Sequence, residues 1–298
     1  MNFKNVTVAG SGVLGYQIAF QTAFHGFKVT VYDINDEVLD KAKAKFDILS
    51  KAYIHDLQAT DEQLKATFEN LSYCSDLAEA VKDADLLIEA VPENPKIKIG
   101  FYEKLAQVAP AKTVFATNSS TLLPSQFAAV TKRPEKFVAL HFANEIWKHN
   151  TAEIMGHPGT ANSVFDDVVD FAKAIGMITL PLYKEQPGYI LNSLLVPLLG
   201  AATNLLVNGV SDVETIDKTW MVATGAPVGP FGILDVVGIT TAYNINKMAA
   251  DKTHDPIKIK TVEFLKENFI DKGKLGVATG EGFYKYPDPA YKNKDFLK

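Results

Sequence analysis

The chain has 298 residues, of which 47% are hydrophobic and 22% are charged, and its formal net charge is −5 at pH 7. This composition is typical of a globular protein with about two domains. Because an acidic chain gains no general electrostatic attraction to nucleic acid or to an anionic membrane, we expect neither as a partner.

Residue types that are rare in this chain narrow the function further. Arg133 is the one arginine among the 30 basic residues, and it stands in a polar segment that indicates a surface turn. Since arginine is the usual bidentate clamp for a carboxylate, a 2-hydroxy-acid dehydrogenase that relies on such a clamp is disfavoured. The one cysteine, Cys74, excludes an intramolecular disulfide and a multi-cysteine metal site, and it fits a reducing, cytoplasmic compartment. The six histidines show no convincing ligand spacing, so no metal is expected.

Short apolar runs alternate with helical patterns over about the first 180 residues, which is typical of βαβ units around a parallel sheet. The expected strands are Val6–Ala9, Lys28–Tyr32, Leu86–Ala90, Thr113–Ala116, Phe137–His141 and Met177–Leu182, with a minor strand that ends at Cys74. The expected helices are Asp36–Ile54, a second one opened by a capping box at Thr60–Gln63, and Ser163–Ile175. We therefore predict an α/β fold with a Rossmann-type, mostly parallel sheet.

The pattern changes near residue 185, where long helical patterns replace the β-branched runs. We expect a Rossmann domain over residues 1–184 and a smaller, all-α C-terminal domain over residues 185–298. Near its start the C-terminal domain has 26 residues without a charge, Gln186–Ser211, a length that could cross a bilayer. Since Asn192, Pro197 and Asn204 interrupt this stretch, a helix buried within a domain or between subunits is the preferred interpretation.

A glycine-rich turn follows the first expected strand. Its G-x-G-x-x-G pattern is made by Gly10, Gly12 and Gly15, and an acidic residue, Asp33, follows the second strand. In such turns the glycines allow a tight bend and a close approach of the backbone to a pyrophosphate at the N-terminus of the next helix. The Asp33 carboxylate would bind ribose hydroxyls and repel a 2′-phosphate. The sequence therefore predicts NAD rather than NADP, while FAD and a turn without a ligand are the less favoured alternatives.

Polar residues follow two further strands, at the edge of the sheet where ligands gather. Residues 117–121 read Thr-Asn-Ser-Ser-Thr, and His141 is followed by Phe-Ala-Asn. A histidine beside a cofactor site is a suitable general acid or base because its ordinary pKa lies near neutrality. Glu153, twelve residues further on, could orient His141 and stabilise its charged form.

Several stretches of the chain together resemble the 3-hydroxyacyl-CoA dehydrogenase family over nearly its whole length. Besides the glycine-rich turn they are Glu89–Asn94, Phe115–Ser120, Leu140–Phe142, Pro187–Asn192, Gly225–Leu234 and Thr279–Lys285. The resemblance implies an NAD-dependent oxidoreductase that interconverts 3-hydroxyacyl and 3-oxoacyl compounds, such as 3-hydroxybutyryl-CoA and its oxidised form. It also implies a cleft between the two domains and a homodimer formed through the helical domain.

The resemblance also assigns roles to single residues. His141 would remove the proton from the 3-hydroxyl group in oxidation, or return it in reduction, with Glu153 as its partner. Ser120 and Asn192 would hydrogen-bond the substrate oxygen. The residues near the nicotinamide side of NAD would be Glu93, Lys98 and Asn144.

Two stretches depart from the usual family pattern. The family motif His-Phe-Phe-Asn-Pro is here His141-Phe-Ala-Asn-Glu, with Trp147 and His149 close behind. A turn that in the family often carries lysines for the phosphates of CoA holds one lysine over residues 51–60. Both departures resemble the diketoreductase branch of the family, which reduces β-keto and β,δ-diketo compounds without requiring CoA.

Three hypotheses therefore stay open. The chain is a 3-hydroxyacyl-CoA dehydrogenase, a diketoreductase-like enzyme for CoA-free esters, or an NAD-binding structural protein of the lens-crystallin kind. The presence of Ser120, His141, Glu153 and Asn192 together disfavours the structural protein. A set of lysines on one helix would either bind the phosphates of CoA or form a solvated face: Lys41, Lys43, Lys45 and Lys51.

Overall fold

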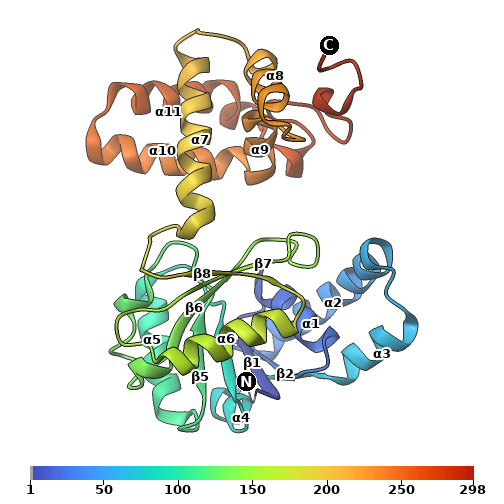
Figure 1. Cartoon of the computed structure of the whole chain (residues 1–298), viewed down its shortest axis with the longest axis vertical. Helices are drawn as coiled ribbons and strands as arrows, with labels where there is room; N and C mark the ends of the chain where they lie inside the picture. Colours follow the sequence, from blue (N-terminus) through green and yellow to red (C-terminus); the bar gives the residue numbers. More distant parts are fainter. Residues whose placement is uncertain (1–2) are drawn as a thin grey trace. The chain divides into compact units, whose positions relative to one another are not determined.

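The structure, a computed structural model, describes residues 3–298, which divide into one compact unit that ends at Leu191 and a second over Asn192–Lys298. The first unit contains an eight-stranded sheet in the order β3-β2-β1-β4-β5-β6-β7-β8 (Figure 1). The strands are β1 (Asn5–Ala9), β2 (Lys28–Tyr32), β3 (Leu71–Cys74), β4 (Leu86–Glu89), β5 (Val114–Thr117), β6 (Phe137–Phe142), β7 (Thr151–Met155) and β8 (Ile178–Leu182).

The strands β1 to β6 pair in parallel, β7 pairs antiparallel with β6, and β8 runs parallel to β7. This topology confirms the predicted Rossmann-type, mostly parallel sheet. Every residue of β4, β5 and β6 is buried, as expected for strands that are covered on both faces. Strand β7, which carries Glu153, was not expected from the sequence.

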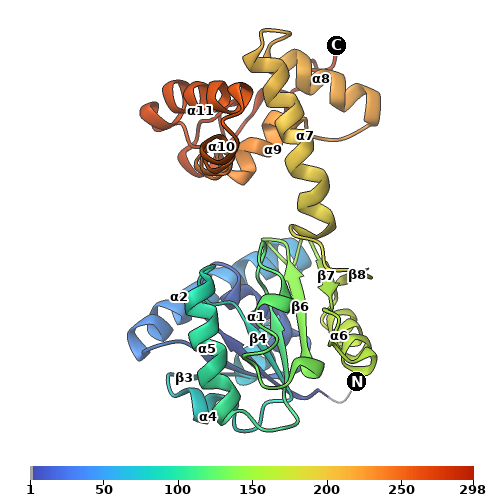
Figure 2. The ribbon, with the colours of Figure 1, turned by 90° about the vertical axis from the view of Figure 1, so that its left-hand side faces the viewer.

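Helices cover both faces of this sheet. They are α1 (Gly15–Phe24), α2 (Asp36–Leu57), α3 (Asp61–Glu69), α4 (Leu77–Val81), α5 (Pro95–Val108) and α6 (Asn162–Ala174). The apolar sides of α1, α2 and α6 form one core with Val6 and Val8 of β1, whereas α4 and α5 form another with Leu87 and Phe115. Figure 2 shows α5 and α6 on opposite sides of the strands. The predicted capping box is confirmed at Thr60 and Gln63.

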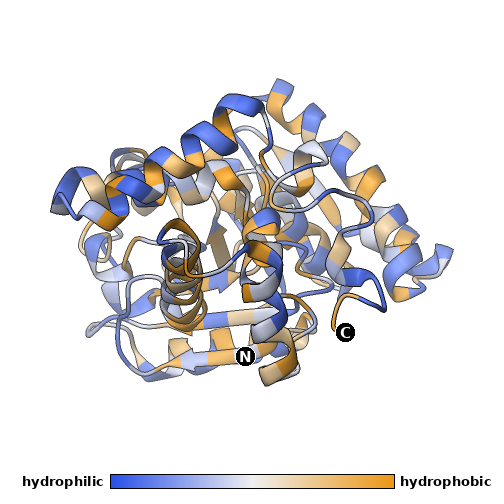
Figure 3. Cartoon of the chain, turned by 90° about the horizontal axis from the view of Figure 1, so that it is seen from above, coloured by the Kyte–Doolittle hydropathy of each residue, from blue (hydrophilic) through white to orange (hydrophobic). Residues whose placement is uncertain are grey.

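The second unit is helical, as predicted. Its helices are α7 (Tyr189–Val207), which begins in the first unit, α8 (Val213–Thr224), α9 (Pro230–Val237), α10 (Ile239–Thr253) and α11 (Pro256–Asn268). Its apolar core includes Phe231, Ile239 and Leu265. In Figure 3, which is coloured by hydropathy and looks along the axis of α7, the turns of this helix are mostly in hydrophobic colours.

Helix α7 corresponds to the uncharged stretch, but it is not buried within the chain. It is long and apolar enough to cross a membrane, yet Leu199 and Ala202 pack into the core of the second unit. In the most apolar stretch of α7 only 22% of the residues are buried, and Leu194 is 70% exposed. The expectation of a helix buried inside one domain is therefore wrong, because one helix side is enough to complete this core. Burial between subunits stays a prediction.

The segment around Arg133 is a surface turn, as predicted, with Lys132 and Glu135 exposed, but the side chain of Arg133 itself is half-buried. Its guanidinium group donates to the carbonyl oxygens of Ala109 (3.1 Å) and Pro110 (2.5 Å), and it lies 4.6 Å from the centre of the Phe115 ring. Burial lowers the pKa of the guanidinium group. The arginine thus ties the segment after α5 to the sheet, and both of its terminal nitrogens are engaged by backbone carbonyl groups.

Candidate active site

The glycine-rich turn after β1 has the shape that a pyrophosphate requires. Gly10 has a φ of +98°, and a Cβ there would lie 2.5 Å from the carbonyl oxygen of Ala90. A Cβ at Gly15 would overlap the carbonyl oxygen of Gly10, whereas apart from Gly12 and its two chain neighbours no atom of residues 3–298 lies within 4 Å of one at Gly12. Open space at Gly12 is where a ligand would approach the backbone, and α1 begins at Gly15 without a side-chain cap on its N–H groups. These features fit the phosphates of a dinucleotide.

Asp33 follows β2 and lies against this turn. Its Oδ2 accepts hydrogen bonds from the backbone N–H (2.7 Å) and the hydroxyl (2.6 Å) of Ser11. The carboxylate therefore holds the turn in place in addition to the ribose-binding role that the sequence predicts for it. Lys45 of α2 donates to the carbonyl oxygen of Ser11 at 3.3 Å, so one cation also reaches this turn.

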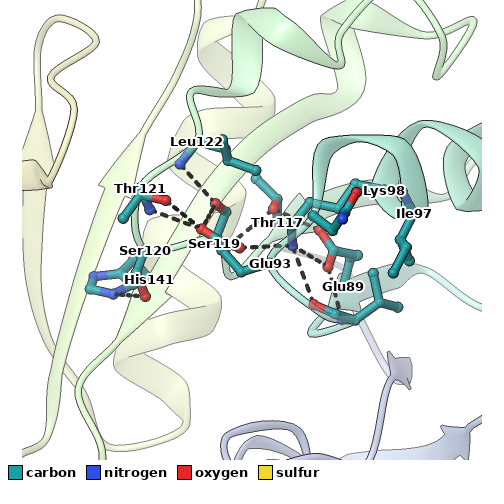
Figure 4. A network of polar contacts seen from close by, with 12 residues as sticks. Glu89, Glu93, Ile97, Lys98, Thr117, Ser119, Ser120, Thr121, Leu122 and His141 are labelled. Carbon is teal, nitrogen blue, oxygen red and sulfur yellow. Dashed lines mark hydrogen bonds and ion pairs between the residues drawn. The ribbon is translucent and has the colours of Figure 1, made fainter. Parts of the chain in front are cut away.

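His141 lies near the carboxyl end of β6 between two polar partners. Antiparallel pairing of β6 with β7 sets His141 directly opposite Glu153. Nδ1 of His141 is 3.0 Å from Glu153 Oε2, and Nε2 is 3.1 Å from Ser120 Oγ. Figure 4 shows the imidazole beside Ser120. The structure thus brings together three of the four predicted catalytic residues.

Glu153 is 3% exposed and remains an ionised carboxyl group in this setting. Burial opposes its charge, but hydrogen bonds from His141 and from the backbone N–H groups of Ile190 and Leu191 outweigh burial and lower its pKa. Both backbone N–H groups lie 2.9 Å from Oε1 and belong to the first turn of α7. An anion is favoured at a helix N-terminus, so the carboxylate is stabilised on both of its oxygens.

Tyr189 is a site residue whose role was not predicted from the sequence. Its ring stacks on the imidazole of His141, with centroids 4.5 Å apart and planes inclined by 17°. Its hydroxyl donates to the carbonyl oxygen of Ser119 at 2.7 Å. Its φ of +55° is uncommon for a bulky residue, and such backbone strain clusters at functional sites. The only sequence signal was its place in the stretch Pro187–Asn192.

A buried polar network lies beside these residues (Figure 4). Glu89 and Lys98 are almost fully buried and form an ion pair at 2.6 Å. Lys98 Nζ also lies 3.3 Å from Glu93 Oε2, whose partner oxygen accepts hydrogen bonds from Ser119 and Thr121. Burial opposes the charge of Glu93, but these hydrogen bonds and the charge of Lys98 lower its pKa. Lys98 thus links the buried Glu89 to the partly exposed Glu93, whereas the sequence predicted only a contact with the cofactor.

The remaining predicted site residues lie in different settings. Asn144 is exposed, three residues after His141, and its Oδ1 accepts a hydrogen bond from Gln17 at 2.8 Å. Asn192 is the first residue of the second unit, in the first turn of α7, and its role toward the substrate stays a prediction. Among residues 3–298 there is no group of three or more His, Cys, Asp or Glu side chains that could hold a metal ion.

The two stretches that depart from the family pattern meet at Asp56, near the end of α2. Its carboxylate accepts a hydrogen bond from the indole N–H of Trp147 (2.8 Å) and pairs with Lys148 (3.0 Å) and His55 (2.7 Å). These hydrogen bonds hold the pKa of Asp56 well below its usual range. Trp147 therefore anchors the connection between β6 and β7 to α2.

A Rossmann-type sheet, a glycine turn open to phosphates and a histidine paired with a buried carboxylate define a dinucleotide-dependent oxidoreductase. Residues 5–186 match the NAD binding domain of 3-hydroxyacyl-CoA dehydrogenase, and residues 188–286 match the C-terminal domain of that enzyme. The chain belongs to the 3-hydroxyacyl-CoA dehydrogenase family, and its cofactor is NAD.

Known relatives cover nearly the whole chain. The human mitochondrial hydroxyacyl-coenzyme A dehydrogenase is 34% identical over 289 residues, which are 95% of this chain and 91% of the relative. A solved diketoreductase structure, described as showing substrate-directed dual catalysis of dicarbonyl compounds, is 57% identical with a TM-score of 0.91 and covers 96% of this chain and 100% of its own. The (S)-3-hydroxybutyryl-CoA dehydrogenase of Ralstonia eutropha is 25% identical with a TM-score of 0.84, over 96% and 100% of the two chains.

Proposed function

We propose that this enzyme interconverts 3-oxoacyl and 3-hydroxyacyl compounds, with His141 as the general acid and base. The observation that carries the proposal is the position of His141 between the carboxylate of Glu153 and the hydroxyl of Ser120. A carbonyl reduction consumes one proton at the oxygen, so one titratable group and one neutral donor there are sufficient.

His141, Glu153 and Ser120 have separate roles in the proton transfer. The nicotinamide, when bound, supplies the hydride donor or acceptor. Nδ1 of His141 donates to the ionised Glu153, which leaves Nε2 to give its proton to the substrate oxygen or to take it back. Ser120, next to Nε2, hydrogen-bonds the same oxygen, and the stacked Tyr189 keeps the imidazole in plane. Because Glu153 stays charged, it accepts from Nδ1 and holds the imidazole in this orientation.

A second candidate function, reduction of CoA-free β-keto or β,δ-diketo esters, is supported by the arrangement of the lysines on α2. Lys41 pairs with Glu37 (2.7 Å) and Lys43 pairs with Asp40 (2.8 Å), so each of these lysines lies beside a carboxylate that would compete with the phosphates of CoA. The likeness to a diketoreductase supports the same candidate. The family match and the hydroxyacyl-CoA relatives support a CoA thioester instead.

Consumption of NADH by the purified enzyme distinguishes these substrates. Acetoacetyl-CoA and a CoA-free 3-oxo ester are compared at matched concentrations. A kcat/KM that is larger for the thioester by a factor of about one hundred, or about 2.7 kcal/mol, assigns a working CoA site. Comparable values, or a preference for the ester, assign a diketoreductase-like enzyme. Failure to oxidise NADH with every 3-oxo compound would overturn both and favour a structural protein.

We also propose that the enzyme is a homodimer in which the apolar side of α7 is covered by a second copy. Leu194 and Leu205 of α7 are exposed, so this side of the helix has apolar surface for a second copy to cover. Light scattering after size exclusion should give twice the 32.6 kDa of the chain. A mass of one chain at micromolar concentration would contradict the dimer.

A further inference from the structure

Gln17 is a buried polar residue in α1, half a turn after the glycine-rich turn, and it has no assigned role. It is 2% exposed and satisfies its whole hydrogen-bonding capacity. Its Nε2 donates to the carbonyl oxygen of Val13 (2.7 Å) and to Oδ1 of Asn144 (2.8 Å). Its Oε1 accepts from the backbone N–H groups of Glu145 (2.9 Å) and Ile146 (3.4 Å).

These contacts fix the orientation of two side-chain amides. A backbone N–H can only donate, so the Gln17 atom that faces Glu145 must be the oxygen. Nε2 of Gln17 then faces Asn144, which must turn its own oxygen inward to accept the hydrogen bond. The amide N–H₂ group of Asn144 is thereby turned away from Gln17, and within residues 3–298 no hydrogen-bond acceptor for it is found.

Gln17 links two segments that lie along the expected position of NADH. Val13 lies inside the turn that receives the phosphates, between Gly12 and Gly15. Asn144 lies three residues after His141, where the reactive end of the cofactor must reach. A hydrogen-bond donor there suits an oxygen of bound NADH, such as the carboxamide oxygen of the nicotinamide.

We propose that Gln17 is a positioning residue that fixes Asn144 as a hydrogen-bond donor toward NADH and ties the phosphate-binding turn to the connection after His141. The proposal rests on the proposed function only in requiring that NADH binds. It explains why a large polar side chain is buried on this helix at no cost in unpaired groups, since each of its polar atoms has a partner.

The test is a double-mutant cycle read by NADH binding, for example by titration of NADH fluorescence. Gln17→Met keeps the length of the side chain but removes all of its hydrogen bonds. We expect the Kd for NADH to rise about tenfold in Gln17→Met and in Asn144→Ala, the size of one hydrogen bond. The double variant should bind about as weakly as either single variant, because both changes remove the same donor. If Gln17 had a purely structural role, the losses of NADH affinity in the two single variants would add in the double variant.

Gln21 supplies the matched control. It is a second buried glutamine of α1, and its amide contacts Ile175 and Tyr53 rather than the turn or Asn144. Gln21→Met should lower the unfolding temperature but leave the Kd for NADH unchanged. An equal loss of affinity in Gln17→Met and Gln21→Met would overturn the assignment.

Gln17→Glu is a second variant for the case that Gln17→Met does not fold. The carboxylate still accepts from Glu145, but it cannot donate to Asn144, which should turn its amide and point its oxygen at NADH. We expect the Kd to rise tenfold or more, with no further rise when Asn144→Ala is added. Wild-type affinity in Gln17→Glu would overturn the proposal. If the wild-type protein binds NADH but reduces no 3-oxo compound, the proposed function fails while the role of Gln17 is still tested.

Discussion

At the scale of single residues, the chemistry depends on the proton that His141 can hold at Nε2. Replacing this residue by glutamine keeps a polar side chain but removes the titratable group. His141→Gln should therefore lower kcat by about 10²- to 10⁴-fold. The Kd for NADH should stay near its wild-type value, because the glycine turn and Asp33 lie on other strands. A variant with near-normal kcat would show that another group transfers the proton.

Glu153 gives the site a dependence on pH that can be measured as stability. Its pKa in the folded protein lies below its value in the unfolded chain, because burial is outweighed by the hydrogen bonds from His141 and the start of α7. A carboxyl group with a lowered pKa stabilises the fold above its unfolded pKa, and this contribution is lost as the pH falls through the folded pKa.

Comparison of wild type with Glu153→Gln isolates this contribution. At pH 7 the variant should be less stable by about 1–3 kcal/mol, because an amide N–H₂ must face either an imidazole or two backbone N–H groups. The difference in unfolding temperature should shrink below about pH 4, where the wild-type carboxyl is protonated too. A difference that is constant from pH 3 to pH 8 would argue against a charged Glu153.

At the scale of elements, the turn between β1 and α1 could be predicted because its constraints are local. Gly10, Gly15 and Asp33 have fixed spacings, and the structure places them as the pattern requires. The pair of His141 and Glu153 could be suspected from the sequence but not placed. Its geometry depends on the antiparallel register of β6 with β7, which is set across an irregular connection.

Gln17 and Tyr189 were not predicted because their roles depend on distant partners. Gln17 reaches a segment more than 120 residues away, and nothing in a single sequence reveals such a contact. Tyr189 looks like an ordinary aromatic residue at a helix start until its stacking on His141 is seen. A buried polar side chain such as Gln17 and a positive φ such as that of Tyr189 are therefore features of the site that a sequence pattern cannot predict.

In the second unit, the glycine-rich stretch Thr279–Lys285 resembles the family, and it packs around the buried carboxylate of Asp235. Asp235 of α9 is 1% exposed, and its carboxylate accepts from the backbone N–H groups of Phe283 (2.8 Å) and Tyr284 (2.8 Å). A Cβ at Gly282 would collide with Oδ1 of Asp235. The stretch Thr279–Lys285 is therefore required for packing around a buried carboxylate rather than for catalysis.

Asp235→Asn tests this role. Burial raises the pKa of Asp235, so the charge itself is costly, yet each oxygen accepts a backbone N–H that an amide nitrogen cannot replace. We expect the second unit to lose about 1–3 kcal/mol of stability. The exposed Asp251, which pairs with Lys247 on α10, provides the control, and Asp251→Asn should change stability by less than about 0.5 kcal/mol. Equal effects of the two changes would contradict the role of the buried carboxylate.

At the scale of the whole molecule, the apolar cores follow the division of the chain. Within residues 3–298 the clusters of the first unit extend no further than Tyr189, and the cluster of the second unit includes Leu199 and residues that follow it. The sequence could predict two domains because the change from alternating strands to helices is a property of composition along the chain. It could not predict that much of α7 stays exposed, since one chain contains no information on what covers that side.

Separate cores predict separate unfolding, which calorimetry can resolve. We expect two transitions, one for each unit, since each core is completed by its own helices. NADH at about one hundred times its Kd should stabilise the first unit by about 2.7 kcal/mol and raise that transition, because the glycine turn and His141 both belong to it. Asp235→Asn should lower the other transition and leave the NADH-dependent one in place. A single transition that shifts both with NADH and with Asp235→Asn would contradict this prediction. It would show that the two cores unfold as one cooperative unit.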